Sequence, residues 1–136
     1  MSSTLFALSG FLAWTLALLT LMELLRCRLV MQKAVPSNGF TPDNANLSPF
    51  MQRLARAHAN CLEGLALFGG LMVVALLAGR AALTDPLAMV LLAARIVQSV
   101  IHLASLSVLA VNLRFTAFAV QLAIAIYWSW GLLAGA

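Results

Sequence analysis

Four long apolar stretches alternate with short polar segments along this chain. Each stretch reaches the roughly 20 residues that a helix needs to cross the hydrocarbon of a membrane. The pattern predicts an all-α membrane protein with helices at about residues 4–30, 49–79, 85–111 and 114–134. Because the later connections are short, neighbouring helices should run antiparallel, as a single up-down four-helix domain over residues 1–136.

Two helix boundaries carry local signals of their own. Thr84-Asp85-Pro86 has the composition of an N-cap followed by proline in the first turn, so it predicts where the third helix begins. A tight turn near Asn112 then separates the third and fourth helices. On this interpretation Arg114 opens the fourth helix.

The composition supports a protein that lies in the membrane. Hydrophobic residues make up 63% of the 136 residues and charged residues only 9%, whereas a soluble domain carries about 25% charged residues. A chain of this size cannot hide so much apolar surface in its own core. The net charge of +4 therefore reports membrane topology rather than nucleic-acid binding. The two cysteines lack CxxC or Cys/His spacing, so no metal site is expected.

Basic residues gather at one end of the predicted bundle. Those that flank the first and third connections are Arg26, Arg28, Lys33, Arg53, Arg56 and Arg114. Only Arg80 flanks the second connection. The positive-inside rule places the first and third connections in the cytoplasm and both termini on the other side. The short chain, with no retention signal, favours a multi-pass protein of a bacterial inner membrane.

The second predicted helix carries a polar stripe, Arg53, Arg56, Asn60 and Glu63, spaced i, i+3, i+7 and i+10. At about 100° per residue these side chains lie within roughly 80° of one another on the helix. Polar groups inside a membrane are costly and indicate function by default. Arginine binds carboxylates, Asn60 offers a donor and an acceptor, and Glu63 can bind an ammonium group. The stripe therefore suits a small zwitterion with several carboxylates.

The basic residues and His58 are interpreted separately. Arg28, Lys33 and Arg53 have the positions of interfacial anchors, whereas Arg56 and Arg114 are the better candidates for ligand binding. His58 is offset by about 200° from Arg56 and points away from the stripe. It is interpreted as a structural or interface residue.

The third predicted helix repeats the spacing with Arg95, Gln98, His102 and Ser105. Arg95 lies too deep to reach the membrane surface easily. We expect it to form a structural ion pair with Glu63, the only buried acid on a neighbouring helix, because buried charges persist chiefly as pairs. For His102 two interpretations stay open: a packing histidine with satisfied hydrogen bonds, or a contact to a ligand.

The run from Arg53 to Glu63, R-L-A-R-A-H-A-N-C-L-E, resembles the second-helix signature of the MAPEG family, the membrane-associated proteins in eicosanoid and glutathione metabolism. The Arg-Cys-Arg end of the first helix, Arg95 and Arg114 extend the resemblance over the whole chain. The resemblance implies a homotrimer that binds glutathione between neighbouring subunits, near the cytoplasmic face.

The resemblance also implies roles for individual residues. Arg56, Asn60 and Glu63 would match glutathione-binding positions, and Arg26 would match a basic contact on the first helix. Arg114 would be the catalytic residue, matching the arginine that stabilises the glutathione thiolate. A nearby guanidinium lowers the pKa of a thiol and so raises its reactive fraction.

Some positions depart from the family pattern. Active members usually carry a tyrosine on the third helix that contacts glutathione, and here Gln98 and His102 stand at the corresponding positions as candidate glutathione contacts. Phe118 occupies an aromatic position on the fourth helix without a hydroxyl group. Gly64 stands where some members have tyrosine.

Two functions are carried forward. The first is a membrane-bound glutathione transferase or peroxidase, in which the thiolate of the co-substrate glutathione attacks an apolar electrophile or a lipid hydroperoxide. The alternative is a non-catalytic membrane trimer that binds glutathione or an anionic lipid. A transporter is disfavoured because the chain shows no inverted repeat.

Overall fold

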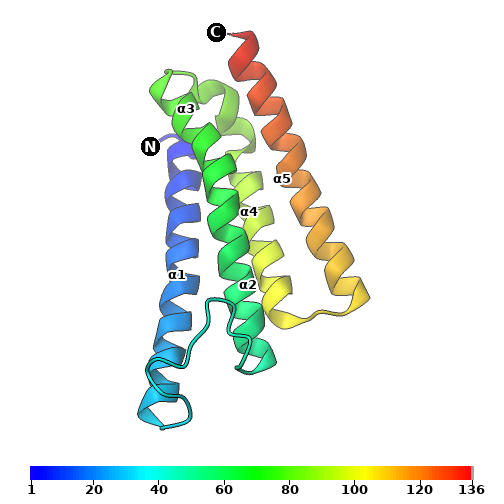
Figure 1. The fold of residues 1–136 in the computed structure, drawn as a ribbon. Coiled ribbons are helices and arrows are strands. Elements are labelled where there is room, and N and C mark those ends of the chain that lie inside the picture. Colours follow the sequence, from blue (N-terminus) through cyan, green and yellow to red (C-terminus); the bar gives the residue numbers. More distant parts are fainter. Residues whose placement is uncertain (136) are drawn as a thin grey trace.

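The computed structural model describes residues 1–135 and is helical, with three connections between the long helices (Figure 1). Its elements are α1 (Ser3–Met31), α2 (Pro49–Gly64), the π-helical turn η1 (Leu65–Gly69), α3 (Gly70–Leu77), α4 (Ala81–Ala104) and α5 (Val108–Ala134). Because α2, η1 and α3 follow one another without a break, they form one span. The described residues thus contain four helices long and apolar enough to cross a membrane, which confirms the predicted all-α membrane fold.

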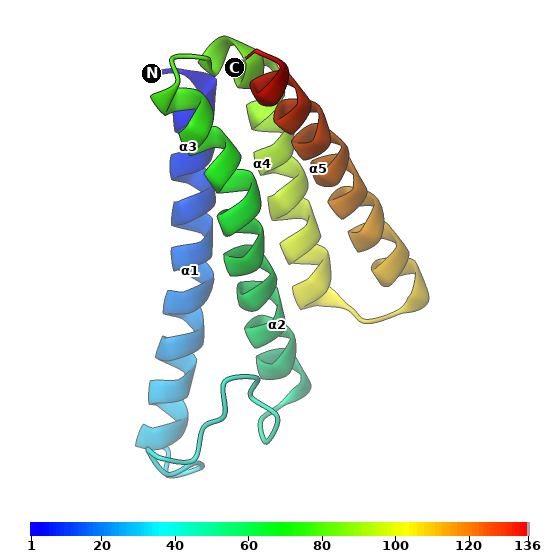
Figure 2. The same cartoon turned by 45° about the horizontal axis from the view of Figure 1, so that its top comes forward.

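The four spans run alternately up and down (Figures 1 and 2). Residues 32–48 and 105–107 lie together at one end, called here the loop end, and both termini lie at the other. In the described part, α5 contacts α4 and reaches the second span only through η1 and α3. Toward the loop end α5 therefore diverges from α2, as Figure 2 shows.

The boundaries predicted between the third and fourth helices are wrong. α4 begins at Ala81 and ends at Ala104, and α5 begins after Ser107, whose hydroxyl accepts the N–H of Ala110 at 3.2 Å. No turn forms near Asn112, because Ser107 caps the helix five residues earlier. Arg114 consequently lies two turns inside α5.

Thr84 and Asp85 do not cap α4 because they bind the start of α1 instead. The Asp85 carboxylate accepts the Thr4 N–H at 2.8 Å and the Thr4 hydroxyl at 2.6 Å. Thr84 and Thr4 also share a hydrogen bond of 2.6 Å between their hydroxyls. Pro86 lies inside α4, where the missing N–H removes one intrahelical hydrogen bond. These contacts join α1 and α4 at the terminal end.

The core lies between all four spans. Its largest fully buried apolar side chains are Phe11, Leu54, Phe68, Met72, Leu91 and Trp128. Many large apolar side chains on the outer faces are exposed, for example Leu16, Leu24, Phe115 and Trp130. In a membrane these faces contact lipid, so the exposed apolar surface of a single chain is what a membrane protein requires.

Candidate functional site

A cavity at the loop end collects three arginines and a histidine from different spans. It has a volume of about 390 Å³ and is lined by Asp43, Ala45, Pro49, Gln52, Arg53, Arg56, His102, Leu106 and Arg114. We call it the basic cavity. Its walls come from the first connection, α2, α4 and α5, so the up-down packing brings together side chains that are up to 71 residues apart in the chain.

The three arginines of the basic cavity differ in the hydrogen bonds that their guanidinium groups make within the chain. Arg53 donates from Nε to the carbonyl oxygen of Leu103 at 2.9 Å and lies 5.9 Å from the ring of Phe50. Arg56 is exposed, and Arg114 has a buried Nε with no hydrogen-bond partner in residues 1–135. Arg53 therefore joins α2 to the end of α4, while Arg56 and Arg114 retain unused hydrogen-bond donors.

His102 both lines the basic cavity and has a partner within the chain. Its side chain is buried, and its Nδ1 lies 3.4 Å from the Asn60 amide nitrogen Nδ2. An amide NH₂ can only donate, so Nδ1 must accept and a neutral ring then carries its proton on Nε2. The two interpretations left open for His102 are thus not exclusive, because it is hydrogen-bonded and also placed at a cavity.

A second cavity lies deeper between the second span, α4 and α5. It has a volume of about 360 Å³ and is lined by Asn60, Glu63, Gly64, Leu67, Phe68, Arg95, Gln98 and Phe118. We call it the deep cavity. Asn60 lines it and hydrogen-bonds His102 of the basic cavity, so the two cavities are neighbours.

A smaller cavity connects the other two along α5. It has a volume of about 230 Å³ and is lined by Gln98, Val111, Arg114, Phe115 and Phe118. This bridging cavity shares Arg114 with the basic cavity, and it shares Gln98 and Phe118 with the deep cavity. Because Phe115 is exposed on the outer face, the series of cavities has an apolar wall toward the lipid.

Arg95 is almost fully buried, but the predicted ion pair with Glu63 is absent. The only ion pair within 4.0 Å in residues 1–135 joins Arg26 to Glu23, at 3.0 Å. Arg95 instead donates from Nε to Gln121 Oε1 at 2.9 Å and from Nη1 to the Asn60 carbonyl oxygen at 3.4 Å. Glu63 is exposed at the rim of the deep cavity. An uncharged acceptor on α5 thus replaces the acid expected on the second span.

Aromatic rings complete the surroundings of Arg95. Its guanidinium carbon lies 5.4 Å from the ring centre of Phe11 and 5.7 Å from that of Phe68, and the negative faces of such rings attract a cation. Gln121 also donates from Nε2 to Gln98 Oε1 at 2.9 Å. The resulting Arg95–Gln121–Gln98 network positions a lining residue of the deep cavity through a residue that our sequence analysis missed.

Two sequence features could have pointed to this network. Gln121 is the one polar side chain between Thr116 and Tyr127, and such residues in a membrane helix rarely lack a partner. Gly64 is the other, since a Cβ atom there would lie 2.6 Å from Arg95 Nη2. Only glycine lets the guanidinium lie this close to the helix backbone, directly before the π-helical turn η1.

Arg26 and Arg28 lie at the loop end, as the sequence predicts, but they do not line the basic cavity of the single chain. Arg26 donates from Nη2 to Asn44 Oδ1 at 2.6 Å and to the Thr41 carbonyl oxygen at 3.1 Å. Asn44 in turn donates to the Met51 carbonyl oxygen at 2.8 Å. Arg26 therefore holds the first connection against α1, and Asn44 holds it against α2.

Comparison with known proteins now identifies the family. The family model described as the MAPEG family matches residues 5–134 of the 136 residues. Searches of curated proteins and of solved structures gave no match. The MAPEG family includes glutathione transferases together with related proteins, and its members generally use glutathione. Since the match covers nearly the whole chain and agrees with the four-span fold, this protein belongs to the MAPEG family.

Proposed function

We propose that this protein is a membrane-bound glutathione transferase that acts on apolar electrophiles or lipid hydroperoxides. The observation that carries the proposal is the basic cavity, in which Arg56, His102 and Arg114 surround one space beside the deep cavity with Glu63. Cavities of about 390 and 360 Å³ fall within the range of roughly 300–1,000 Å³ that is typical of small-molecule sites.

The free hydrogen-bonding groups match the chemistry of glutathione, which carries two carboxylates and one ammonium group. Arg56 is exposed and can bind a carboxylate through its guanidinium fork. Glu63 is exposed at the rim of the deep cavity and can accept the ammonium group. Asn60 and Gln98 add amide groups between these charges. His102 contributes the Nε2–H that its hydrogen bond to Asn60 leaves available.

Arg114 is the residue we assign to catalysis. It lies where the basic and bridging cavities meet, and its Nε has no partner in the described chain. A guanidinium beside the glutathione sulfur stabilises the thiolate, which is the nucleophile. In conjugation of an aryl halide, sulfur forms a bond to carbon, the halide leaves with the bonding pair, and the thiol proton passes to water.

The same site supports peroxidase chemistry. Two glutathione molecules are oxidised to the disulfide while a hydroperoxide is reduced to an alcohol and water. The apolar side chains of Val111, Phe115 and Phe118 line the bridging cavity beside Arg114. A substrate dissolved in the membrane would reach the thiolate from that side.

We further propose that the working unit is a homotrimer in a bacterial inner membrane, with the loop end in the cytoplasm. Arg56 and Glu63 are exposed in a single chain although they lie on a membrane-spanning helix, and polar groups facing lipid are costly. A neighbouring subunit would cover them. Arg26 of the partner subunit would then be the residue that supplies the basic contact from α1.

A non-catalytic trimer that binds glutathione or an anionic lipid is the second candidate. None of the described residues lining the three cavities carries a hydroxyl group. Hydroxyl groups commonly assist thiolate formation by donating a hydrogen bond. Binding without turnover is therefore a specific alternative.

The test combines binding and turnover. Purified protein should show a glutathione-dependent rise in thermal stability and should conjugate a chlorodinitrobenzene. Arg114→Ala should lower turnover by about 10²–10³-fold, the usual loss when one donor to a developing anion is removed, with the trimer intact. Lys33→Ala, which removes an exposed cation of the first connection, should leave turnover unchanged. Binding without turnover across several electrophiles would support the second candidate, and no glutathione-dependent shift would refute the transferase.

A further inference from the structure

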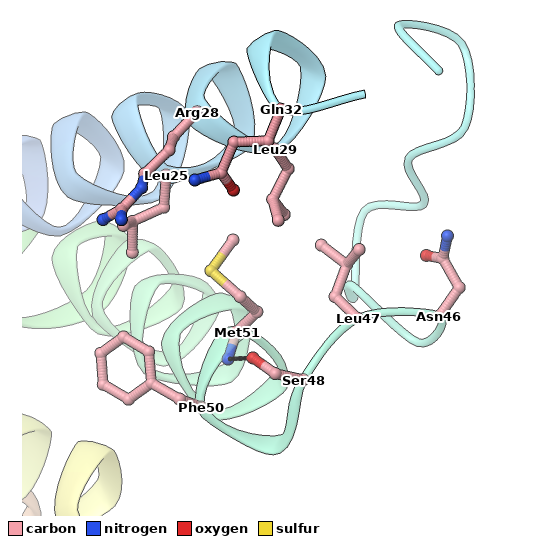
Figure 3. Close-up of a pocket in the computed structure, with 9 residues that line it drawn as sticks. All are labelled: Leu25, Arg28, Leu29, Gln32, Asn46, Leu47, Ser48, Phe50 and Met51. Atoms are coloured by element: carbon pink, nitrogen blue, oxygen red, sulfur yellow. Dashed lines mark hydrogen bonds between the residues drawn. The ribbon is translucent and has the colours of Figure 1, made fainter. Parts of the chain in front are cut away.

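A separate cavity of about 450 Å³ lies between the last turns of α1 and the first turn of α2 (Figure 3). It is lined by Leu25, Arg28, Leu29, Gln32, Asn46, Leu47, Ser48, Phe50 and Met51. None of these residues lines the basic, bridging or deep cavity. We call it the α1–α2 cavity, and the proposed glutathione chemistry gives it no role.

One side of the α1–α2 cavity is apolar and held in place. Leu29, Leu47 and Met51 come from three different segments and face the same space in Figure 3. Met51 is buried, and its N–H donates to the Ser48 hydroxyl at 3.3 Å. Because this N-cap bond begins α2, Met51 belongs to the helix bundle and fixes one part of the apolar wall.

The other side is polar and carries an unused cation. Arg28 and Gln32 lie one turn apart on α1 and both line the cavity. Within residues 1–135 neither side chain makes a hydrogen bond, whereas the neighbouring Arg26 binds Glu23, Thr41 and Asn44. The guanidinium and amide donors at this edge are therefore available to an anion.

The length of α1 places this edge at the level of the lipid head groups. α1 has 29 residues, and at 1.5 Å per residue it is about 43 Å long, against roughly 30 Å of hydrocarbon. Arg28 lies in the last turn, so it extends beyond the hydrocarbon. Basic residues in this layer attract anionic lipids, and arginine binds phosphate through two parallel N–H groups.

We propose that the α1–α2 cavity binds an anionic glycerophospholipid of the surrounding membrane. The phosphate contacts Arg28 and Gln32, and one acyl chain packs against Leu29 and Met51. The ligand must be amphipathic because the cavity joins a cationic edge to an apolar wall. An anionic head group is favoured because Arg28 is an exposed cation with no acid within 4.0 Å in the described chain.

The experiment measures lipid binding directly, so its outcome is independent of glutathione turnover. Delipidated trimer is titrated with phosphatidylglycerol or phosphatidylcholine of the same acyl composition, and bound lipid is counted by native mass spectrometry. We expect about one tightly bound phosphatidylglycerol per chain and weaker binding of phosphatidylcholine. Arg28→Gln should weaken phosphatidylglycerol binding about tenfold, as expected for loss of a charged hydrogen bond.

Lys33→Gln is the matched control, since it removes one positive charge near Arg28 from a residue that lines none of these cavities. It should bind phosphatidylglycerol as the wild type does. Leu29→Gln should weaken binding of both lipids through the apolar wall. Equal binding of the two lipids by the wild type, or an equal loss in Arg28→Gln and Lys33→Gln, would overturn the proposal. Tighter binding of a free fatty acid, or a lipid-independent dimer lost in Arg28→Gln, would also overturn it.

Discussion

Replacing Gly64 by alanine adds one methyl group beside the buried Arg95 and tests whether its guanidinium is held in place. The added Cβ atom would lie 2.6 Å from Arg95 Nη2, 3.1 Å from Arg95 Cζ and 3.4 Å from Phe11 Cζ. Separations below about 3 Å do not occur between such atoms without displacement. The outcome therefore depends on whether the guanidinium can move.

The surroundings of Arg95 hold the guanidinium in place. Its Nε donates to Gln121, its guanidinium carbon lies 5.4 Å and 5.7 Å from the ring centres of Phe11 and Phe68, and the residue is 1% exposed. Overpacking of a filled interior costs about 1–3 kcal/mol. Alanine also stabilises a helix by about 0.5–1 kcal/mol relative to glycine. The net destabilisation expected for Gly64→Ala is therefore between about 0 and 2.5 kcal/mol.

Gly70→Ala provides the matched control in the same span. A Cβ at Gly70 meets no atom within 4 Å, so Gly70→Ala should gain only the stability that alanine gives a helix relative to glycine. The free energies of unfolding of the two variants should then differ by about 1–3 kcal/mol, the overpacking cost alone. Denaturant unfolding in one detergent, at one protein concentration because an oligomer is expected, measures this difference. If Gly64→Ala proves as stable as Gly70→Ala, Arg95 is not held as described.

The remaining two predictions concern Gln121 and Asp43. Gln121→Leu leaves a buried Arg95 N–H without its acceptor, so it should lower the free energy of unfolding by about 1–3 kcal/mol. Gln121→Glu keeps an acceptor at this position and should lower the free energy of unfolding less. Both variants are measured in the same denaturant assay. The Thr41 hydroxyl and the Ala45 N–H, which both donate to Asp43, hold the pKa of that carboxyl below its ordinary value of 3.8. Because the folded-state pKa is the lower one, this support of the first connection is present above pH 3.8 and is lost as the pH falls further. Cleavage of residues 32–48 by pepsin should therefore accelerate more in the wild type than in Asp43→Asn as the pH falls below 3.8, since the change in the activity of pepsin itself is common to both.

The fold could be predicted because membrane thickness fixes the length of an apolar helix. Four stretches of sufficient length and few charges lead to four spans whatever the details of packing. The start of α4 could not be predicted in the same way. Thr84 and Asp85 have the composition of a cap, but their partner is Thr4, 80 residues away. Whether a residue of this type caps its own helix or binds another helix depends on tertiary contacts.

For the candidate site as well, the groups of residues within one helix could be predicted, but the contacts between helices could not. Helical spacing grouped Asn60 with Glu63 on one face of the second span and Arg95 with Gln98 on one face of α4, and all four side chains line the deep cavity. Spacing within one helix says nothing about the rotation of the next helix around its axis. The partner of Arg95 depends on the rotation of α5, which presents Gln121. For the same reason Arg26, assigned to the ligand from resemblance, is occupied by Asn44 in the single chain.

Unused hydrogen-bonding capacity separates the arginines that hold the bundle from those that can act on a ligand. Arg95 and Arg53 bond Gln121 and Leu103 within the chain, so using them to bind substrate would first require breaking contacts that support helix packing. Arg114 makes no such bond through its buried Nε, and leaving it unpaired costs about 1–3 kcal/mol. A ligand anion at Arg114 would recover this free energy without disturbing the bundle. Arg114 lies two turns inside α5, where it lines both the basic and the bridging cavity, so an anion held in either cavity can reach its guanidinium.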